Sequence, residues 1–331
     1  MSIKVLELRP NPKSKSNGID KYCNALRAMF ADDDFIKILP VKNYPMIKGK
    51  IQKERYEKGV LDRAINEQDV DIVHINGFGS LSVIQMFWHA KKAKKKIVYT
   101  AHWHPFKYLN HPFRAKVFFY LLLKPFIKRY ADVVVTINNE DTAFFKKFHN
   151  NVKQIPHWID GELSSPKVDV EKDSSMVLFV GRFNDPNKGA EHLSYLPEGK
   201  YNIHCVGPCN GGLRSDMTSH VNIPFEELCQ LYAKASLLVV PSRYEAFSYV
   251  ALEALSYGTP VLLSDRVKIA DYLERIEGVT VFKYHDYQDF CDKVKKSVEA
   301  SIIIDKEKIM KRFSGKVIKE KYRTIFTSLG K

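Results

Sequence analysis

The sequence lacks any apolar run long enough to cross a lipid bilayer. Its longest apolar run in a basic setting, VFFYLLL at residues 117–123, falls far short of the roughly 20 residues that a transmembrane helix needs. The first residues, MSIKVLELRPNP, hold no apolar stretch typical of a signal peptide, and Glu7 interrupts the strand-like segment there. We therefore expect a cytoplasmic protein.

Cysteine is scarce and shows no pairing pattern. The chain of 331 residues has five cysteines, an odd number, and no Cys-x-x-Cys pair. This usage favours reduced thiols over a disulfide framework. The segment HCVGPC at residues 204–209 has no second pair of ligands for a metal, so we interpret it as ordinary buried residues. No metal site is expected.

Acidic residues are scarce in the first half of the chain. Residues 1–160 hold 28 Lys and Arg against 15 Asp and Glu, a net charge of +13, whereas residues 161–331 hold 24 against 23, a net charge of +1. Such asymmetry suggests that the first half meets nucleic acid, an anionic membrane surface or a phosphorylated substrate. The charge alone does not choose among them.

Short β-branched runs alternate with helix-length segments along the whole chain. Strands are predicted at 3–8, 71–75, 96–102, 131–137, 152–157, 175–182, 201–207, 236–242 and 260–265. This alternation predicts an α/β fold, with parallel sheets covered by helices on both faces. Because the second half repeats the pattern of the first, we expect two Rossmann-like domains facing across a central cleft. Ligands bind at the carboxyl ends of such strands, so a facing pair would form one shared site.

The domain boundary is predicted at a segment poor in large apolar residues, 161–175. Residues 1–160 then form the first domain and 161–310 the second. A basic amphipathic helix is predicted at 305–326. The C-terminal helical segment, from about residue 310 to residue 331, either packs as an ordinary terminal helix or crosses back onto the first domain.

Two glutamates lie eight positions apart in PSRYEAFSYVALEALSYGTP, residues 241–260. Glu245 is predicted in the loop after a buried strand, and Glu253 about one turn into a helix that starts near Ser248 or Tyr249. A carboxylate among core residues is costly unless hydrogen-bond donors meet it. Ligand hydroxyls are such donors, and a helix start attracts phosphate, so the pattern suits a sugar nucleotide. The alternative is a surface acid followed by a salt-bridged helix acid.

A second pattern precedes the glutamates in FVGRFNDPNKG, residues 179–189. A predicted strand ends at Gly181, and Arg182 and Lys188 flank the turn that follows. Two cations at the carboxyl end of a strand can clamp a diphosphate, arginine by its planar fork and lysine as a point charge. Opposite the glutamates, they form a complementary half-site.

Together these motifs resemble the retaining GT-B glycosyltransferases, in particular glycosyltransferase family 4. The resemblance covers most of the chain, because DIVHINGF, YTAHWH, ADVVVTINN and VKQIPHWID follow the order of that family's landmarks in the acceptor domain. It implies a GT-B fold with an N-terminal acceptor-binding domain and a C-terminal nucleotide-sugar-binding domain.

The resemblance also implies roles for the charged residues. Arg182 and Lys188 would hold the donor diphosphate and stabilise the leaving nucleotide phosphate. Glu253 would accept hydrogen bonds from the nucleotide ribose, and Glu245 would bind hydroxyls of the donor sugar. Five residues separate the two cations where the family usually has four, so Lys188 is the less secure of the pair.

Backbone amides complete the implied donor site. Those of Phe247, Ser248 and Tyr249 would support the sugar and the phosphate. Ser248 stands where the family frequently has glycine, which could add a hydroxyl to the donor pocket.

The first domain contributes residues to the implied site as well. Gly18 belongs to the loop after the first strand, which approaches the diphosphate and the acceptor. Asn17 precedes it where many relatives have a second glycine. His102 would reach the donor sugar near the reacting carbon, with His104 as a rival for this role. The dipeptide His157-Trp158 replaces a common Asn-Gly, which we expect to alter the turn between domains and not the chemistry.

The reaction implied by the family retains the configuration at the anomeric carbon. The acceptor hydroxyl attacks from the face of the leaving group, and a phosphate oxygen of that group takes its proton. Catalysis then rests on positioning and on stabilising departing charge, with no metal and no cofactor. The donor is expected to be a UDP- or GDP-sugar. The acceptor is expected to be a glycan or a lipid-linked acceptor, as in bacterial surface polysaccharide or glycolipid synthesis.

A basic and apolar segment, HPFRAKVFFYLLLKPFIKRYA at residues 111–131, bears on localisation. A segment that lies on an anionic lipid surface has this composition, but so does a buried helix with basic ends. Together with the charge of the first half, it leads us to expect a peripheral enzyme at the cytoplasmic face of a membrane.

Two other functions compete with this interpretation. A GT-B sugar-nucleotide epimerase shares the two-domain layout but converts its donor without an acceptor. A basic nucleic-acid-binding protein would explain the charge, but no recognition helix, stacking motif or zinc module is present. The acidic run ADDD at residues 31–34 is interpreted as a solvated loop and not as a metal-binding motif.

Overall fold

The computed structural model divides the chain into two compact units. Unit 1 comprises Met1–His157 and Gly315–Lys331, and unit 2 comprises Trp158–Ser314. The expected boundaries were residues 160 and 310. The residues that the structure describes are 2–10, 18–40, 46–47, 55–77, 80–102, 104, 112–159, 170–300 and 302–330.

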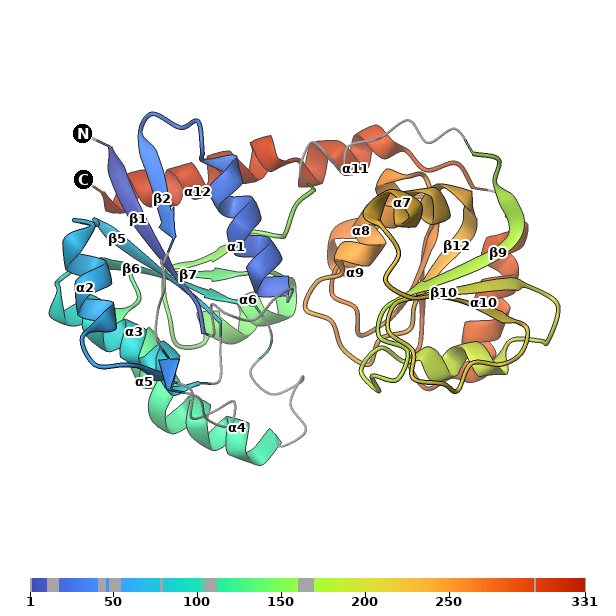
Figure 1. Ribbon diagram of the computed structural model, residues 1–331, viewed down its shortest axis with the longest axis horizontal. Coiled ribbons are helices and arrows are strands. Elements are labelled where there is room, and N and C mark those ends of the chain that lie inside the picture. The colour runs from blue at the N-terminus through green and yellow to red at the C-terminus, as the bar shows by residue number, and fades with distance from the viewer. Residues whose placement is uncertain are drawn as a thin grey trace. The chain divides into compact units, whose positions relative to one another are not determined.

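Unit 1 is built on a parallel sheet of six strands in the order β2-β1-β5-β6-β7-β8 (Figure 1). Its strands are β1 (Ile3–Leu8), β2 (Ile36–Pro40), β5 (Ile72–Asn76), β6 (Lys96–Ala101), β7 (Val133–Thr136) and β8 (Val152–Gln154). A short antiparallel pair, β3 (Met46–Ile47) and β4 (Arg55–Tyr56), stands apart from it. The helices are α1 (Gly18–Met29), α2 (Val60–Glu67), α3 (Leu81–Lys92), α4 (Pro112–Phe118), α5 (Lys124–Tyr130), α6 (Asn139–Lys146) and α12 (Gly315–Leu329).

Alternation along β1 assigns its side chains to two faces of the sheet, because successive residues of a strand point in opposite directions. Leu6 and Leu8 are fully buried in a cluster with Val83 and Met86 of α3. Glu7 points to the other face, where Arg27 of α1 lies 3.6 Å from its carboxylate. Helices therefore cover both faces, as the alternating pattern predicts.

Unit 2 repeats the plan with the strand order β11-β10-β9-β12-β13-β14. Its strands are β9 (Asp173–Val180), β10 (Asn202–Val206), β11 (Met217–His220), β12 (Ala235–Val240), β13 (Val261–Ser264) and β14 (Val279–Phe282). Its helices are η4 (Ala190–Tyr195, a 3₁₀-helix), α7 (Phe225–Lys234), α8 (Tyr249–Ser256), α9 (Ala270–Leu273), α10 (Tyr287–Glu299) and α11 (Lys306–Phe313). The order reverses between β9 and β12, and such sheets bind ligands at this point of reversal.

The α/β fold and two Rossmann-like units are confirmed; that the units face one another across a cleft stays a prediction. Three edge strands, β2, β11 and β14, were missed. For β11 the burial pattern gives the reason, because none of its residues 217–220 is fully buried. An edge strand with little apolar content gives little periodic signal.

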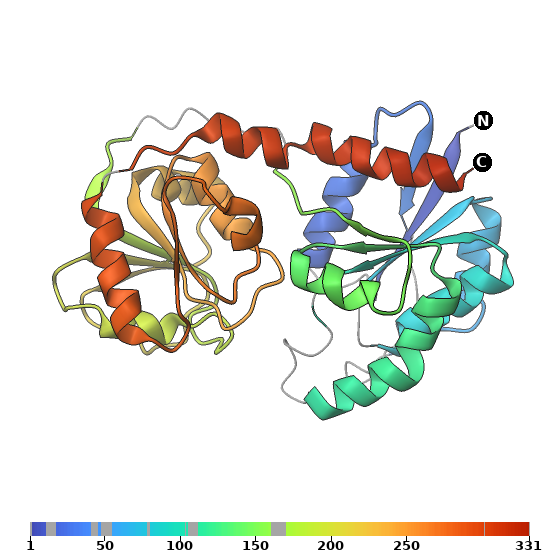
Figure 2. The same ribbon diagram turned by 180° about the vertical axis from the view of Figure 1, so that it is seen from behind.

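The prediction of a single terminal helix at 305–326 is wrong. The chain is extended at Ser314, with φ of −69° and ψ of 144°, and this residue separates α11 from α12. Helix α12 belongs to unit 1 and contacts β1 (Figure 2). The hydroxyl groups of Tyr22 in α1 and Tyr322 in α12 form a buried hydrogen bond of 2.6 Å.

The interpretation of residues 31–34 as a solvated loop fails at Asp33, which is buried. Its carboxylate accepts hydrogen bonds from the backbone of Phe35 and Ile36 and pairs with Lys319 and Arg323 of α12. Burial raises the pKa of Asp33, but the two backbone hydrogen bonds and the two cations outweigh it, and the pKa lies below its ordinary value. This acid ties the terminal helix to unit 1.

Candidate functional site

The loop after β9 lies against the end of β12 in unit 2. Gly189, at the end of this loop, has φ of +67°, and a Cβ atom there would lie 1.9 Å from the carbonyl oxygen of Pro241. Only glycine permits this approach. The backbone N–H of Arg243 donates to the carbonyl of Asn187 at 2.8 Å, so the two loops at the point of strand reversal are joined.

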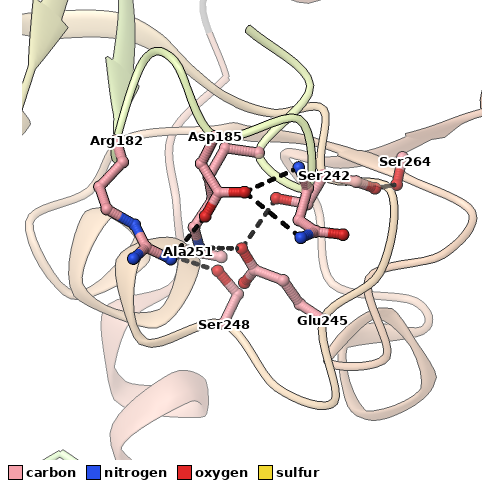
Figure 3. Close-up of polar contacts among 9 residues, drawn as sticks. Arg182, Asp185, Ser242, Glu245, Ser248, Ala251 and Ser264 are labelled. Atoms are coloured by element: carbon pink, nitrogen blue, oxygen red, sulfur yellow. Dashed lines mark hydrogen bonds and ion pairs between the residues drawn. The ribbon is translucent and has the colours of Figure 1, made fainter. Parts of the chain in front are cut away.

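Lys188 and Glu245 meet across these two loops, although they are 57 residues apart. Nζ of Lys188 donates to Oε1 of Glu245 at 2.6 Å, and Oγ of Ser242 donates to the same oxygen at 2.8 Å (Figure 3). The carbonyl of Ser242 in turn accepts from Oγ of Ser264 at 2.6 Å. Both members of the pair are mostly buried, so the carboxylate is held in one position.

Arg182 is the more accessible of the two cations. Its guanidinium donates to Oδ2 of Asp185 at 2.5 Å, while its side chain remains 61% exposed. The chain turns twice between the cations, since Asp185 N–H donates to the carbonyl of Arg182 and Lys188 N–H to the carbonyl of Asp185. These turns take up the additional residue that set this loop apart from the family pattern, and Lys188 still reaches Glu245.

Helix α8 begins at Tyr249, as predicted. The Ser248 hydroxyl accepts from the backbone N–H of Ala251 at 3.3 Å and thereby caps the helix. This capping role accounts for a serine at the position, because a side-chain oxygen satisfies one of the N–H groups that a helix start leaves unpaired. The ring of Phe247 is buried beside Tyr272 and Phe313, so this residue can offer a ligand its backbone only.

Glu253 is buried in α8, as predicted, but the protein itself supplies one donor. The Tyr232 hydroxyl of α7 donates to Oε2 of Glu253 at 3.0 Å. Burial, and then the negative charge of Glu253, raise the pKa of Tyr232 well above its ordinary value, so this hydroxyl stays a donor. Sequence reasoning missed Tyr232, which lies 21 residues from Glu253 in a different helix.

The two predicted residues of unit 1 lie on separate elements. Gly18 is the first residue of α1 and not part of the preceding loop, and a Cβ atom there would meet no atom within 4 Å. His102 follows β6 and is buried. His104 is buried as well, with its ring 5.2 Å from the ring of Phe144.

His102 belongs to a group of buried neutral rings. Its Nε2 lies 2.9 Å from Oδ1 of Asn76, and Nδ2 of Asn76 donates to the carbonyl of His74. This orients the amide so that His102 carries its proton on Nε2. Its Nδ1 is then an acceptor, and it has no hydrogen-bond partner among the residues that the structure describes.

Burial, followed by the neighbouring His157 and His74, lowers the pKa of His102 well below its ordinary value. The rings of His102 and His157 are stacked, with centroids 5.8 Å apart, and burial lowers the pKa of His157 to about 3. The sequence motif gave His157 no part in the chemistry, so its contact with His102 was missed. Asn76, which ends β5, was missed too.

Within the described residues, no group of three or more His, Cys, Asp or Glu side chains is arranged to hold a metal ion. Metal-independent transfer stays a prediction. No helix in the described part of the chain is both long and apolar enough to span a membrane.

Two family models match the chain, and together they span parts of both units. Residues 22–163 match Glycosyltransferase Family 4, and residues 174–299 match Glycosyl transferases group 1. Among curated proteins, an uncharacterized 41.2 kDa protein in the cps region of Klebsiella pneumoniae is 22% identical over 67% of this chain and 67% of its own. Two further relatives are covered over only 34% of their length.

Solved structures share the whole fold at low identity. Sucrose-phosphate synthase from Thermosynechococcus elongatus aligns with a TM-score of 0.72 and 17% identity, over 99% of both chains. HepE from Anabaena, in complex with UDP-glucose, aligns with a TM-score of 0.68 and 16% identity, over 98% of this chain and 100% of its own. With these two family models and this fold over nearly the full length, the chain belongs to the group 1 (family 4) glycosyltransferases of the GT-B fold.

Proposed function

We propose that this glycosyltransferase transfers a sugar, with retention of configuration, from a UDP- or GDP-sugar to a glycan or a lipid-linked acceptor. The observation that carries the proposal is that Arg182 and the Lys188–Glu245 pair lie in the two joined loops where the strand order of unit 2 reverses. Cations bind a diphosphate, and a carboxylate accepts strong hydrogen bonds from sugar hydroxyls. Both chemistries are present at this edge.

In the free protein both cations rest on carboxylates, Arg182 on Asp185 and Lys188 on Glu245. A bound diphosphate offers the same cations a doubly charged alternative, so its arrival frees Glu245 to accept sugar hydroxyls. After the exchange the cations pair with the diphosphate, and Glu245 keeps the hydrogen bond from Ser242 while sugar hydroxyls replace Lys188 as its donors.

Glu253 accepts the ribose hydroxyls in this proposal. Tyr232 satisfies Oε2 from inside the unit, which fixes the carboxylate without neutralising it. We place the phosphates at the N-terminus of α8, near Ser248, because the free N–H groups of a helix start bind anions. HepE, whose structure contains UDP-glucose, makes UDP-sugars the first donors to test.

Transfer itself then depends on charge and position. When the glycosidic bond breaks, Arg182 and Lys188 stabilise the departing phosphate, and a phosphate oxygen accepts the proton of the attacking hydroxyl. His102 contributes as a neutral ring, because burial disfavours the doubly protonated imidazolium, and its Nδ1 accepts a hydrogen bond from a sugar hydroxyl. Its contact with the donor sugar rests on the resemblance to the family.

Calorimetric titration with UDP-glucose and with GDP-mannose tests the donor site. Glu253→Gln should weaken binding of the preferred nucleotide sugar at least tenfold, since a ribose hydroxyl hydrogen-bonded to a charged acceptor contributes about 1.5–3 kcal/mol. Tyr232→Phe is the matched control, because it removes the hydroxyl from Oε2 and leaves the carboxylate in place. Equal affinity of Glu253→Gln and the parent protein would contradict the ribose role.

Product analysis with the preferred donor separates the remaining alternative. A sugar-nucleotide epimerase converts the donor to a new nucleotide sugar with no acceptor present. A transferase releases the free nucleotide diphosphate and attaches the sugar to an acceptor with an unchanged anomeric configuration.

A further inference from the structure

The segment 112–130 forms one helical rod of unit 1 with a wide turn in its middle. Helix α4 continues through a π-helical turn, η2 (Phe119–Leu123), into α5. The buried residues recur at every fourth position, Ala115, Phe119, Leu123 and Ile127. In a regular α-helix positions four apart drift by about 40° per step, and the wider π turn returns them to one face. These four side chains therefore lie on one side of the rod, which packs against the rest of unit 1.

The opposite side of the rod exposes large apolar side chains. Phe113 is 77% exposed and Leu121 71% exposed, and Val117, Tyr120 and Leu122 are exposed beside them. Exposed apolar residues are ordinary when scattered, but five on one helix form a patch that marks an interaction site.

The same rod carries only positive charge. Its cations are Arg114, Lys116, Lys124, Lys128 and Arg129, and residues 112–130 contain no Asp or Glu. Lys124 lies over the rings of Tyr120 and Phe148, 5.1 Å from each centroid, so its stem lies along the apolar surface. Cations that flank an apolar face are the pattern of helices that lie on anionic bilayers.

Helix α3 packs against η2 and α5 of the rod. Trp88 of α3 is 58% exposed, and Lys91, one turn along the helix, lies over the ring of Tyr130 of α5 at 5.7 Å. Tryptophan favours the boundary between lipid and water, because its ring is apolar and its N–H is polar.

We propose that the rod of residues 112–130, together with Trp88, docks on an anionic lipid surface. The apolar side chains enter the boundary between headgroups and acyl chains, and the cations contact the headgroups. An anionic bilayer satisfies both features at once. A nucleic-acid backbone would match the cations and leave Phe113 and Leu121 in water. The inference rests on the proposed function only in that it places a lipid-linked acceptor beside unit 1.

Sedimentation of the full chain with vesicles tests the proposal. Binding should be strong with equal parts of phosphatidylglycerol and phosphatidylcholine, weak with phosphatidylcholine alone, and weakened by salt. The double variant Phe113→Ser/Leu121→Ser should lower partitioning about tenfold or more. Ile303→Ser is the control, because Ile303 of unit 2 is 89% exposed and lies outside the patch.

The charges are tested in the same way. Lys116→Gln/Lys128→Gln should lower partitioning about 25-fold, since each basic residue near an anionic surface contributes about fivefold. Lys295→Gln/Lys296→Gln, on the exposed side of α10 in unit 2, should leave it unchanged. Equal binding to both vesicle types, or patch variants that bind like the parent, would overturn the proposal.

Two further measurements distinguish lipid docking from self-association and from failure of the donor site. Light scattering that shows dimers lost in Phe113→Ser/Leu121→Ser, without vesicle binding in the parent, would assign the patch to a second copy of the chain and overturn the lipid proposal. Titration of the patch variants with UDP-glucose and GDP-mannose should match the parent, so loss of membrane binding and loss of donor binding are told apart.

Discussion

The carboxyl edges of the two sheets share a backbone plan, but they hold different polar groups after their central strands. In unit 2 the edge holds ionised pairs, Lys188 with Glu245 and Arg182 with Asp185. In unit 1, Asn76 at the end of β5, His102 after β6 and His157 after β8 are buried and neutral. The described residues of this edge also hold an ion pair, that of Arg9, after β1, with Asp20 at 2.6 Å. The difference teaches that the strand pattern provides a place for a site, while the residues after each strand decide which ligand charge that place accepts.

Glu245 of unit 2 and Glu7 of unit 1 also differ in the groups that surround their carboxylates. Glu245 at the edge of unit 2 meets a lysine and a serine hydroxyl. Glu7, near the end of β1, is buried, and the guanidinium of Arg27 lies 3.6 Å from its carboxylate. Burial raises the pKa of Glu7 to about 8, and the charge of Arg27 lowers it only in part. A buried acid of unit 1 is thus protonated near neutral pH.

The largest expected effect is on turnover and comes from removing a cation at the carboxyl edge of the unit 2 sheet. Arg182→Ala should lower turnover about 100- to 1,000-fold, the usual loss when a group that stabilises developing negative charge is removed. The measurement is the release of nucleotide diphosphate from the donor that the titrations select. Lys295→Ala on α10 is the control for loss of a surface charge, and a near-normal rate in Arg182→Ala would remove it from leaving-group stabilisation.

Glu7 allows the buried acid of unit 1 to be tested by pH. Between its unfolded value near 4.5 and its folded value of about 8, only the folded state holds the proton. The free energy of unfolding therefore falls as pH rises, by up to about 1.4 kcal/mol per pH unit. Glu7→Gln cannot lose this proton, so its stability relative to the parent should increase by about 3 kcal/mol between pH 5 and pH 8.

Urea unfolding at the two pH values measures that difference. The exposed Glu277→Gln in unit 2 should show no such trend and serves as the control. If the difference in unfolding free energy between Glu7→Gln and the parent is the same at both pH values, the carboxyl group of Glu7 is ionised in the folded protein at both.

The smallest expected effect is on stability and concerns the neutral histidines at the carboxyl edge of the unit 1 sheet. His157 has a folded pKa of about 3 because it is buried. As pH falls below about 6.5, the unfolded state therefore binds a proton that the folded state does not, and stability falls by about 1.4 kcal/mol per pH unit. His157→Asn should remove the part that His157 contributes to the fall of the unfolding free energy at acid pH.

The measurement is the slope of unfolding free energy against pH, taken from urea unfolding between about pH 6 and pH 4.5. His285→Asn, at an exposed position of unit 2 with a left-handed backbone that asparagine tolerates, provides the control. An unchanged slope in His157→Asn would mean that the imidazole is already protonated in the folded protein.

Much of the donor site was predictable because its residues follow strands directly. Arg182 comes two residues after β9, and Glu245 follows β12 after a short turn. Periodicity locates such strands, so the residues at their ends are located with them. Glu253 was predictable for another reason, since an acid in an apolar helix stands out in the sequence.

The partners of these residues were not predictable, because they come from distant parts of the chain. Tyr232 approaches Glu253 from a neighbouring helix, and His157 reaches His102 from 55 residues away in sequence. Neither residue belongs to a periodic pattern that points to its neighbour. The break at Ser314 was hidden for a similar reason, because the amphipathic pattern continues through it.

The sequence by itself determined the α/β class, the positions of the central strands and the identity of the residues that follow them, since these depend on local hydrophobic period and composition. Only the tertiary structure decided how those residues are paired and charged. Burial and the proximity of groups remote in sequence keep His102 neutral, place Lys188 on Glu245 and leave the cations of the rod at residues 112–130 beside an exposed apolar face. Desolvation and contact act through space, and a one-dimensional pattern does not contain them.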